Sequence, residues 1–197
     1  MIAGVDAAPS DWTLAPAARP LAHASLRSLQ QQLRTALAAR SGAAGAHCIH
    51  ELWMRGALGL DVDAALDALW RCAAESIPEW LPMRYVEWLP LAYEVALRFR
   101  AQRSGRYCVY LVLLDCHDRR GGPHGVYVGM SHYAPSVRFD QHKAGIRASG
   151  AVLKRGLEVL TGPTLHLAHV ARAEALRIEA QLASALAEAG LIVAGGH

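Results

Sequence analysis

The sequence predicts an α/β protein in which a helical N-terminal region is followed by a small α/β sandwich with a central antiparallel three-stranded sheet. All five tryptophans precede residue 104, and the apolar residues of this region recur at three- and four-residue steps, a spacing typical of amphipathic helices. After residue 104, short runs rich in β-branched and aromatic residues alternate with helical patterns, which indicates strands combined with helices. We therefore expect two domains, residues 1–104 and residues 105–197.

The first domain is expected to contain four helices. Leu26, Leu29 and Leu33 share one face of the first helix, which ends before a glycine-rich segment. Residues 1–20 hold three prolines and are expected to form an irregular lead-in. The expected helices span 24–40, 46–57, a segment that Asp61 or Asp63 caps, and 85–100 with a bend at Pro90.

The second domain is expected to begin with a β-hairpin. Residues 107–114 and 126–130 have strand composition, and a polar, glycine-rich turn at 116–125 joins them. Pro135 is typical of the first turn of a helix and Gly145 of its end, which predicts a helix at 135–144. The remaining expected elements are a helix at 150–160, a strand at 165–170, a helix at 172–189 and a short terminal strand at 191–194.

Composition narrows the class of protein. The apolar fraction of 53% and the mean hydropathy of +0.14 are sufficient for a packed core and argue against disorder. No run of about 18 residues is apolar enough to span a bilayer. The first residues lack the basic start and apolar block of an export signal, so we expect a cytoplasmic protein without membrane association. The four cysteines have no metal-site spacing and are expected to be reduced thiols.

The net charge of +3 is confined to the second domain. Residues 105–197 contain ten Lys/Arg and seven Asp/Glu, whereas residues 1–104 contain ten of each. This surplus is compatible with a polyanionic partner such as DNA but does not by itself require one.

Five motif elements in the second domain occur in a recognisable order. The tripeptides Cys108-Val109-Tyr110 and Tyr127-Val128-Gly129 lie on the two expected hairpin strands. Arg138 follows Gly129 by nine residues, His142 follows four residues later, and Glu179 lies on the last expected helix. In this order and spacing, residues 105–197 resemble the GIY-YIG nuclease family, with Cys108, Met130 and Ala180 as departures from its usual pattern.

The resemblance implies a metal-dependent endonuclease that hydrolyses phosphodiester bonds in DNA. In this family, the metal on Glu179, Mg²⁺ or Mn²⁺, would polarise the phosphate and stabilise the leaving oxygen. Arg138 would offset the charge of the phosphate, and Tyr110, or alternatively Tyr127 or His142, would take a proton from the attacking water. The substrate backbone would be contacted by Gly129, Lys143, Arg147, Lys154 and Arg155.

The residue pattern supports this grouping independently of the resemblance. Strand side chains alternate in direction, so Tyr110 and Tyr127 can lie close together across a hairpin. Arg138 and His142 are four residues apart and share one helix face. Glu179 falls within an apolar helical stripe, where a carboxylate is costly unless it is paired or binds a cation. The stripe consists of Ala175, Leu176, Leu182, Ala183 and Leu186.

Two other interpretations remain open at this stage. The second domain is alternatively a non-catalytic module that binds nucleic acid or protein, or an enzyme in which Tyr110, Arg138 and His142 act on a different phosphoester. In the first domain, His47, His50 and Glu51 do not have the spacing of a two-histidine metal site, and we expect them to lie on an ordinary helix surface.

Overall fold

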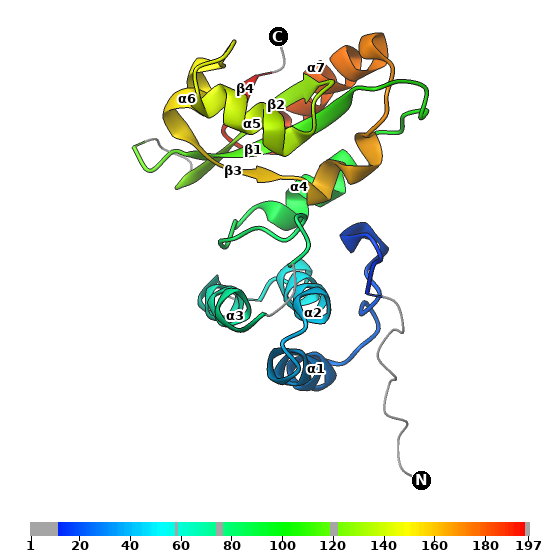
Figure 1. Ribbon diagram of the computed structural model, residues 1–197, viewed down its shortest axis with the longest axis vertical. Helices are drawn as coiled ribbons and strands as arrows, with labels where there is room; N and C mark the ends of the chain where they lie inside the picture. Colours follow the sequence, from blue (N-terminus) through cyan, green and yellow to red (C-terminus); the bar gives the residue numbers. More distant parts are fainter. Residues whose placement is uncertain (1–11, 58, 74–76, 119–121, 196–197) are drawn as a thin grey trace. The chain divides into compact units, whose positions relative to one another are not determined.

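The structure is a computed structural model that describes residues 12–57, 59–73, 77–118 and 122–195 (Figure 1). Its internal contacts divide the chain into two compact units, Met1–Pro90 and Leu91–His197. Residues 91–104, which the composition assigned to the first domain, therefore belong to the second unit. The start of the expected lead-in, residues 1–11, and part of the expected hairpin turn, residues 119–121, lie outside the described residues.

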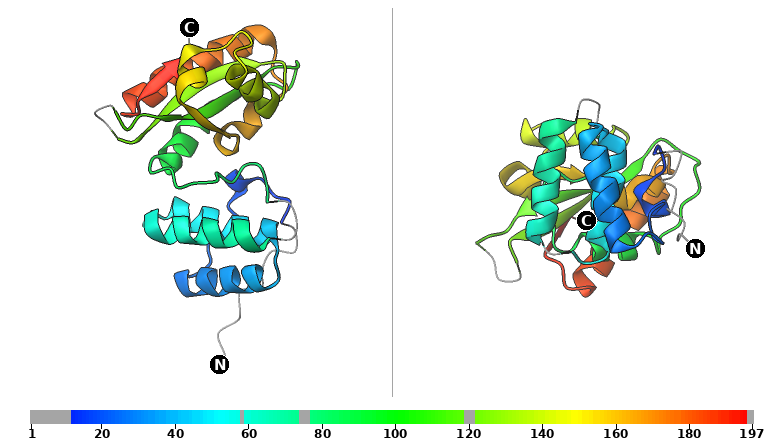
Figure 2. Two further views of the ribbon diagram at one scale, coloured as in Figure 1. Left: turned by 60° about the vertical axis from the view of Figure 1, so that its left-hand side comes forward. Right: turned by 90° about the horizontal axis from the view of Figure 1, so that it is seen from below.

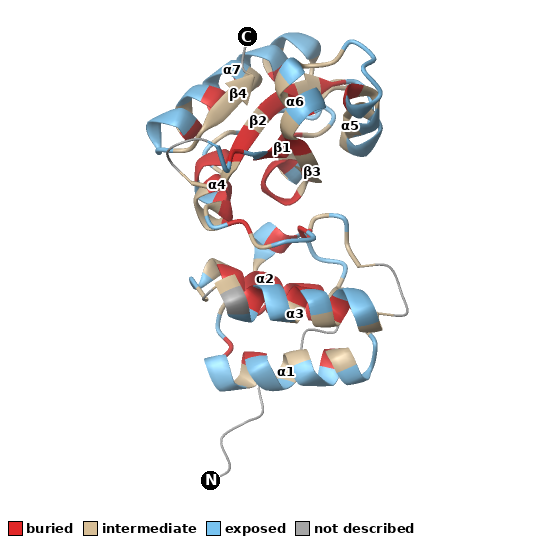
Figure 3. Ribbon diagram, turned by 90° about the vertical axis from the view of Figure 1, so that its left-hand side faces the viewer, coloured by how far each residue is buried: buried red, intermediate tan, exposed pale blue. Residues whose placement is uncertain are grey.

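The described residues of the first unit form three whole helices and a short 3-10 turn, Pro16–Ala18. The helices are α1 (Leu26–Ala38), α2 (Gly42–Met54) and α3 (Gly59–Cys72), so the first three expected helices are present. Helix α2 begins four residues earlier than expected, and Asp61 lies in the first turn of α3 rather than at its N-cap. The hydroxyls of Ser25 and Ser41 accept hydrogen bonds from backbone amides in the first turns of α1 and α2, as N-cap residues do. Most of α2 is buried, so it forms the centre of this unit, as the burial colours of Figure 3 also show.

The polar residues of α2 are buried, which corrects the expected helix surface. His47, His50 and Glu51 are each about 1–2% exposed. Glu51 accepts hydrogen bonds from Nε and Nη2 of Arg19 (3.0 and 2.8 Å) and from Nε of Arg55 (2.6 Å). A carboxylate this deeply buried requires such paired cations. Arg55 also donates to backbone carbonyls that precede α1, so the ion cluster ties this segment to α2.

The second unit is built on a mixed sheet of four strands rather than the expected antiparallel sheet of three (Figures 1 and 2). The strand order is β3-β1-β2-β4, and β1 is antiparallel to both of its neighbours. The last strand pairs in parallel with β2 because the chain returns through a helix before it joins the sheet. The strands are β1 (Cys108–Asp115), β2 (His124–Ser131), β3 (Gly156–Leu160) and β4 (Val193–Gly195).

Residues 150–170 differ from expectation. The expected helix at 150–160 is a short helix, α6 (Gly150–Arg155), that runs directly into β3. The first half of the expected strand at 165–170 belongs to a 3-10 helix, η2 (Gly162–Leu167), and Val170 makes an isolated antiparallel β-bridge with Tyr107. Burial alternates along β3, which pairs with β1, so contact with a distant strand decided the conformation. Pro163 suits the first turn of η2, where its missing amide costs little.

The remaining helices flank the sheet and the fourth is shorter than expected. It is α4 (Leu89–Ala96), with Pro90 in its first turn, so the helix starts near this proline instead of bending there. On one face of the sheet, Tyr110 and Val112 pack with residues of α5 (Pro135–Lys143) and α6. The last helix, α7 (Arg172–Glu188), packs against β2 and β4. Across the described residues, no helix is both long enough and apolar enough to cross a bilayer.

Candidate active site

The hairpin register places the two tyrosines of the tripeptides on one face of the sheet. Tyr110 lies opposite Gly129, and Tyr127 lies opposite Val112. The two phenol rings are therefore diagonal neighbours, with centroids 6.3 Å apart. A side chain on Gly129 would place its Cβ 2.6 Å from a ring carbon of Tyr127 and 2.9 Å from the hydroxyl oxygen of Tyr110. The sequence suggested that a substrate backbone approaches Gly129. In the structure, the two phenols occupy the space next to this glycine.

Tyr110 forms a hydrogen-bonded chain with α5 and the start of α6. Its hydroxyl oxygen lies 3.1 Å from Nε2 of His142, and both side chains are buried. The backbone amide of Ser149 donates to Nδ1 of the same imidazole over 2.9 Å. The ring of Tyr127 stands edge-on to this imidazole, with centroids 5.8 Å apart. The phenol of Tyr110 and the imidazole of His142 are therefore fixed side by side, and the ring of Tyr127 is next to both.

The ionisation of these groups is coupled to two charged residues. Burial raises the pKa of Tyr110, the negative charges of Tyr127 and Glu179 add to the rise, and Arg138 opposes it. Burial likewise raises the pKa of Tyr127, with Glu179 again raising it and Arg138 lowering it. Hydrogen bonds from the side chains of Ser149 and Tyr110 also lower the pKa of Tyr127. Both phenols therefore lie within the electrostatic reach of one guanidinium and one carboxylate.

His142 is uncharged near neutral pH. Burial, and after it the neighbouring positive charge of Arg138, lower its pKa to about 4. This value lies well below the ordinary pKa of 6.5. A neutral imidazole has one ring nitrogen that donates and one that accepts, so its two hydrogen bonds must run in opposite directions.

Arg138 is held by the segment that follows α5. Its Nη1 donates to the side-chain oxygen of Gln141 and to the carbonyl of Ile146, both at 3.1 Å, and its Nη2 donates to the carbonyl of Arg147 at 2.7 Å. Gly145 and Arg147 adopt positive φ angles of 78° and 45°, which turn this segment back toward the guanidinium. The cation is therefore oriented by two backbone carbonyls and one side-chain amide oxygen.

Glu179 is half-buried on α7, beside the apolar stripe of this helix. The stripe differs in part from expectation: Leu176 is 43% exposed, and Ile178 is buried in its place. Through its charge Glu179 reaches both Tyr110 and Tyr127. The acidic residue of the predicted constellation therefore influences the ionisation of both phenols.

The basic residues predicted to contact substrate are only partly near this group. Lys143 donates to the carbonyls of Leu153 and Gly156 and so ties α5 to the end of α6. Arg155 forms a two-point ion pair with Asp118 (2.5 and 2.8 Å). Arg155 also donates to the carbonyl of Asp115, which is five residues, or about 16 Å, along β1 from Tyr110.

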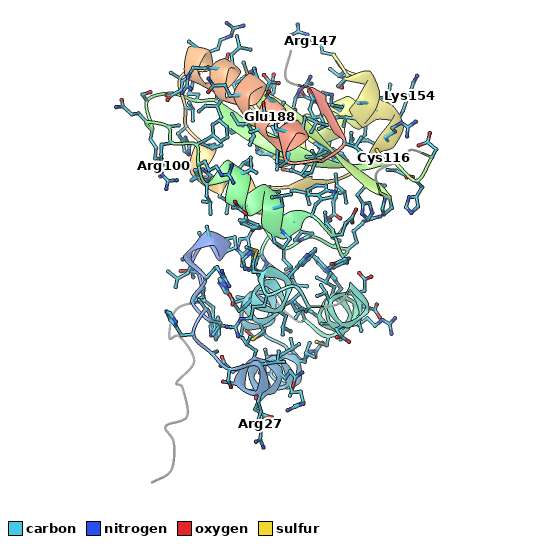
Figure 4. All side chains as sticks on the ribbon, turned by 180° about the vertical axis from the view of Figure 1, so that it is seen from behind. Arg27, Arg100, Cys116, Arg147, Lys154 and Glu188 are labelled. Atoms are coloured by element: carbon cyan, nitrogen blue, oxygen red, sulfur yellow. The ribbon has the colours of Figure 1, made fainter. Side chains whose placement is uncertain are left out.

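Lys154 belongs to the same remote end of the hairpin, whereas Arg147 belongs to the site. Lys154 lines a surface hollow of about 350 Å³ together with Asp118 and Arg155. Arg147 is exposed, and its carbonyl binds Arg138, which places it next to the site. Figure 4 labels Arg147 and Lys154 at separate places on this unit.

Ser149 is a residue of the site that the sequence did not reveal. It precedes the first turn of α6, yet its hydroxyl makes no capping bond to that helix. Its amide donates to His142, and a hydrogen bond of its side chain lowers the pKa of Tyr127. A serine before a helical pattern reads as a routine N-cap, so no sequence signal separates the two roles.

The donor set is suited to a hard cation that keeps most of its waters. Within the described ranges, no three or more His, Cys, Asp or Glu side chains are grouped so as to hold a metal ion. Glu179 is thus a single carboxylate in a half-buried setting, which fits Mg²⁺ or Mn²⁺ shared with substrate oxygens better than it fits zinc.

Comparisons with models of protein families, with curated proteins and with solved structures find no match for this chain. The functional argument therefore depends on the side chains described above.

Proposed function

We propose that the second unit is a metal-dependent endonuclease of the GIY-YIG type that hydrolyses phosphodiester bonds in DNA. The observation that carries the proposal is that Tyr110 and Tyr127 share one hairpin face next to His142, while the charges of Arg138 and Glu179 shift the pKa of both phenols. Two phenols, a guanidinium and a carboxylate would together supply a phosphate ligand, a cation ligand and proton-transfer groups.

Arg138 is the phosphate ligand in this proposal. A guanidinium has five N–H donors, and the hydrogen bonds to Gln141, Ile146 and Arg147 account for three of them in the described part of the chain. The Nε–H and one N–H of Nη2 remain for two oxygens of a phosphate, the geometry in which arginine binds such groups best. Because its other donors are fixed, the guanidinium is oriented before substrate arrives.

Tyr127 is the better placed of the two phenols to take a proton from the attacking water. The sequence favoured Tyr110, but that side chain is only 1% exposed, whereas Tyr127 is half-buried. Hydrogen bonds from Tyr110 and Ser149 to the oxygen of Tyr127 stabilise its phenolate, and the charge of Arg138 adds to this effect. Tyr110 thus acts as a donor to the base rather than as the base.

Glu179 holds the divalent cation in this proposal, together with water and the phosphate oxygens of the substrate. A bound Mg²⁺ or Mn²⁺ supplies Lewis-acid polarisation of the phosphate and offsets charge on the leaving oxygen. The carboxylate of Glu179 raises the pKa of both phenols. Neutralising its charge would therefore make the phenolate of Tyr127 easier to form.

The proposal is tested by nicking of supercoiled plasmid DNA with Mg²⁺, with Mn²⁺ and with a chelator. We expect nicking only with metal, and a loss of at least about a hundredfold in Glu179→Gln, which keeps the shape but removes the charge. Glu188→Gln is the matched control, because Glu188 is exposed on the same helix and hydrogen-bonds to Ser184. Nicking by Glu179→Gln at the wild-type rate would contradict the proposal.

The same assay distinguishes the proposed endonuclease from the alternative of a non-catalytic binding module. A protein that binds DNA in a salt-sensitive way, cuts nothing and does not respond to metal would be a binding module on this fold. Cleavage of small phosphodiesters without cleavage of DNA would instead support an enzyme for another phosphoester.

A further inference from the structure

The imidazole of His142 lies between two hydrogen-bonding groups. One of them, a backbone amide, can only donate a hydrogen bond, and the other, a phenol hydroxyl, can donate or accept one. On one side, the backbone amide of Ser149 is 2.9 Å from Nδ1. On the other side, the hydroxyl oxygen of Tyr110 is 3.1 Å from Nε2. The side chain is 2% exposed, so water does not compete freely for either nitrogen.

This arrangement fixes the tautomer of the ring. A backbone amide always donates, so Nδ1 must present its lone pair to Ser149 and carries no proton. The single proton of the neutral imidazole is then on Nε2, and it points at the oxygen of Tyr110. His142 therefore donates to Tyr110 and cannot accept its hydroxyl proton.

We infer that His142 is a positioning residue, which the amide of Ser149 holds as a permanent neutral donor that orients the hydroxyl of Tyr110 beside the phenol of Tyr127. The inference rests on the proposed function, because it states how one histidine serves the base of that reaction. Since the oxygen of Tyr110 accepts from His142, the hydroxyl proton of Tyr110 points away from the imidazole. That proton is then available to the neighbouring Tyr127, whose pKa a hydrogen bond with the side chain of Tyr110 lowers.

The groups around the imidazole oppose any other protonation state. Arg138, on the same helix, repels an imidazolium, and Tyr110 and Tyr127 are neutral phenols near pH 7. A second proton on Nδ1 would also face the amide proton of Ser149. Burial lowers the pKa of His142 to about 4, in agreement with this geometry.

The first test reads the tautomer directly and needs no activity. Long-range proton–nitrogen correlation spectra of the ¹⁵N-labelled full chain distinguish an Nε2–H from an Nδ1–H imidazole. The signal of His142 among the ten histidines is assigned by its loss in His142→Gln. We expect an Nε2–H ring that does not titrate between about pH 5 and 8. An Nδ1–H ring, or a titration near pH 6.5, would overturn the inference.

The second test uses a pair of substitutions at one position. The amide of His142→Gln can donate its N–H to Tyr110 and accept from Ser149, whereas His142→Phe fills the space and does neither. We expect nicking by the glutamine variant within about tenfold of wild type with an unchanged pH profile, and a loss of about a hundredfold in the phenylalanine variant. A folded glutamine variant as inactive as the phenylalanine variant would mean that the histidine itself transfers a proton.

The two tests fail in distinguishable ways. A wild-type protein with the Nε2–H ring that never cuts DNA contradicts the proposed endonuclease but not the hydrogen-bond chain. An active wild-type protein whose histidine titrates near pH 6.5 contradicts the inference and leaves the endonuclease standing.

Discussion

At Gly129, the absence of a single methyl group allows two phenols to share one strand face. The glycine is buried opposite Tyr110, and the ring of Tyr127 leans over it from the same strand. Glycine in a strand usually costs about 0.5–1 kcal/mol of stability relative to alanine. At this position a larger residue would displace the two phenols, so glycine is required here despite that cost.

Replacing this glycine should disturb the site and the stability together. In Gly129→Ala the new methyl group meets Tyr127 at 2.6 Å and Tyr110 at 2.9 Å, so both rings must move. We expect a loss of about 1–3 kcal/mol in the unfolding free energy, measured by calorimetry, together with most of the nicking activity. Gly150→Ala is the control, because a methyl group there meets no atom within 4 Å. Equal stability of the two variants would contradict this account.

The residues of the site differ in how far the sequence could predict them. Tyr110, Tyr127, Arg138 and Glu179 belong to local patterns that the fold brings together. Ser149 could not be predicted, because its contribution is partly a backbone amide whose direction depends on the turn after α5. Arg155 was assigned to the substrate because its partner, Asp118, is 37 residues away in the sequence.

At the scale of elements, local periodicity failed where a long-range partner decided the structure. The expected hairpin and helices at 135–144 and 172–189 are present because their patterns are strong and their neighbours are close in sequence. Residues 156–160 became a strand because β1, the central strand, offers a free edge that β3 fills. Residues 162–167 form a 3-10 helix instead of a strand, because Pro163 favours a helical turn there.

Helix α2 contains a second long-range feature, the ion cluster of Glu51 with Arg19 and Arg55. Burial raises the pKa of Glu51, but the hydrogen bonds and charges of the two arginines outweigh it, so its pKa is lowered from 4.5. A lowered carboxylate pKa stabilises the fold above the unfolded value, and this contribution is lost as the pH falls through the folded value. The cluster therefore supports the first unit at neutral pH and weakens below about pH 4.5.

Glu51→Gln should reveal this contribution in the first unit. All five tryptophans lie before Leu91, so denaturant unfolding followed by their fluorescence reports this unit. We expect a loss of about 1–3 kcal/mol at pH 7 that shrinks below pH 4.5. Asp67→Asn, which breaks an exposed pair with Arg71, should change stability by less than about 1 kcal/mol.

The histidines of α2 add a second acid effect to wild type and to Glu51→Gln, and the charge of Glu51 modifies it because that charge raises the pKa of His50. Burial lowers the pKa of His47, and it lowers that of His50 to about 4. A base whose pKa is lowered in the fold destabilises it as the pH drops below the ordinary value of 6.5. The difference between wild type and Glu51→Gln therefore reports the carboxylate together with its effect on His50. A difference that persists at pH 3 would contradict the assigned role of Glu51.

At the scale of the whole molecule, the charge divides more sharply by structural unit than by the expected boundary. Residues 91–197 contain thirteen Lys/Arg and eight Asp/Glu, whereas residues 1–90 contain seven and nine. The net charge is therefore +5 in the unit that contains the candidate site and −2 in the other. A polyanion would be attracted to the first of these and repelled by the second.

DNA binding should accordingly depend on salt and on the charge near Arg138. Glu179→Gln, which we expect not to cut, is used for the binding measurement. We expect its affinity for DNA to fall steeply between about 50 and 200 mM salt in fluorescence anisotropy. Adding Arg147→Asn should weaken binding by about two- to tenfold and lower the salt slope by about one, because one cation that contacts phosphate is lost. Asparagine is chosen because it tolerates the positive φ angle of this position. Arg71→Gln, in the other unit, serves as the control. Affinity that ignores salt would exclude a backbone-directed interface.

The turn between α5 and α6 has a consequence for how such a site can diversify. The phenols are fixed to the two central strands, but the guanidinium of Arg138 takes its direction from the carbonyls of Ile146 and Arg147. Insertions or deletions in this turn would re-aim the cation while the sheet stays intact. The length of this loop can therefore change the distance between the phosphate-binding Arg138 and the proton-accepting Tyr127 without repacking the interior.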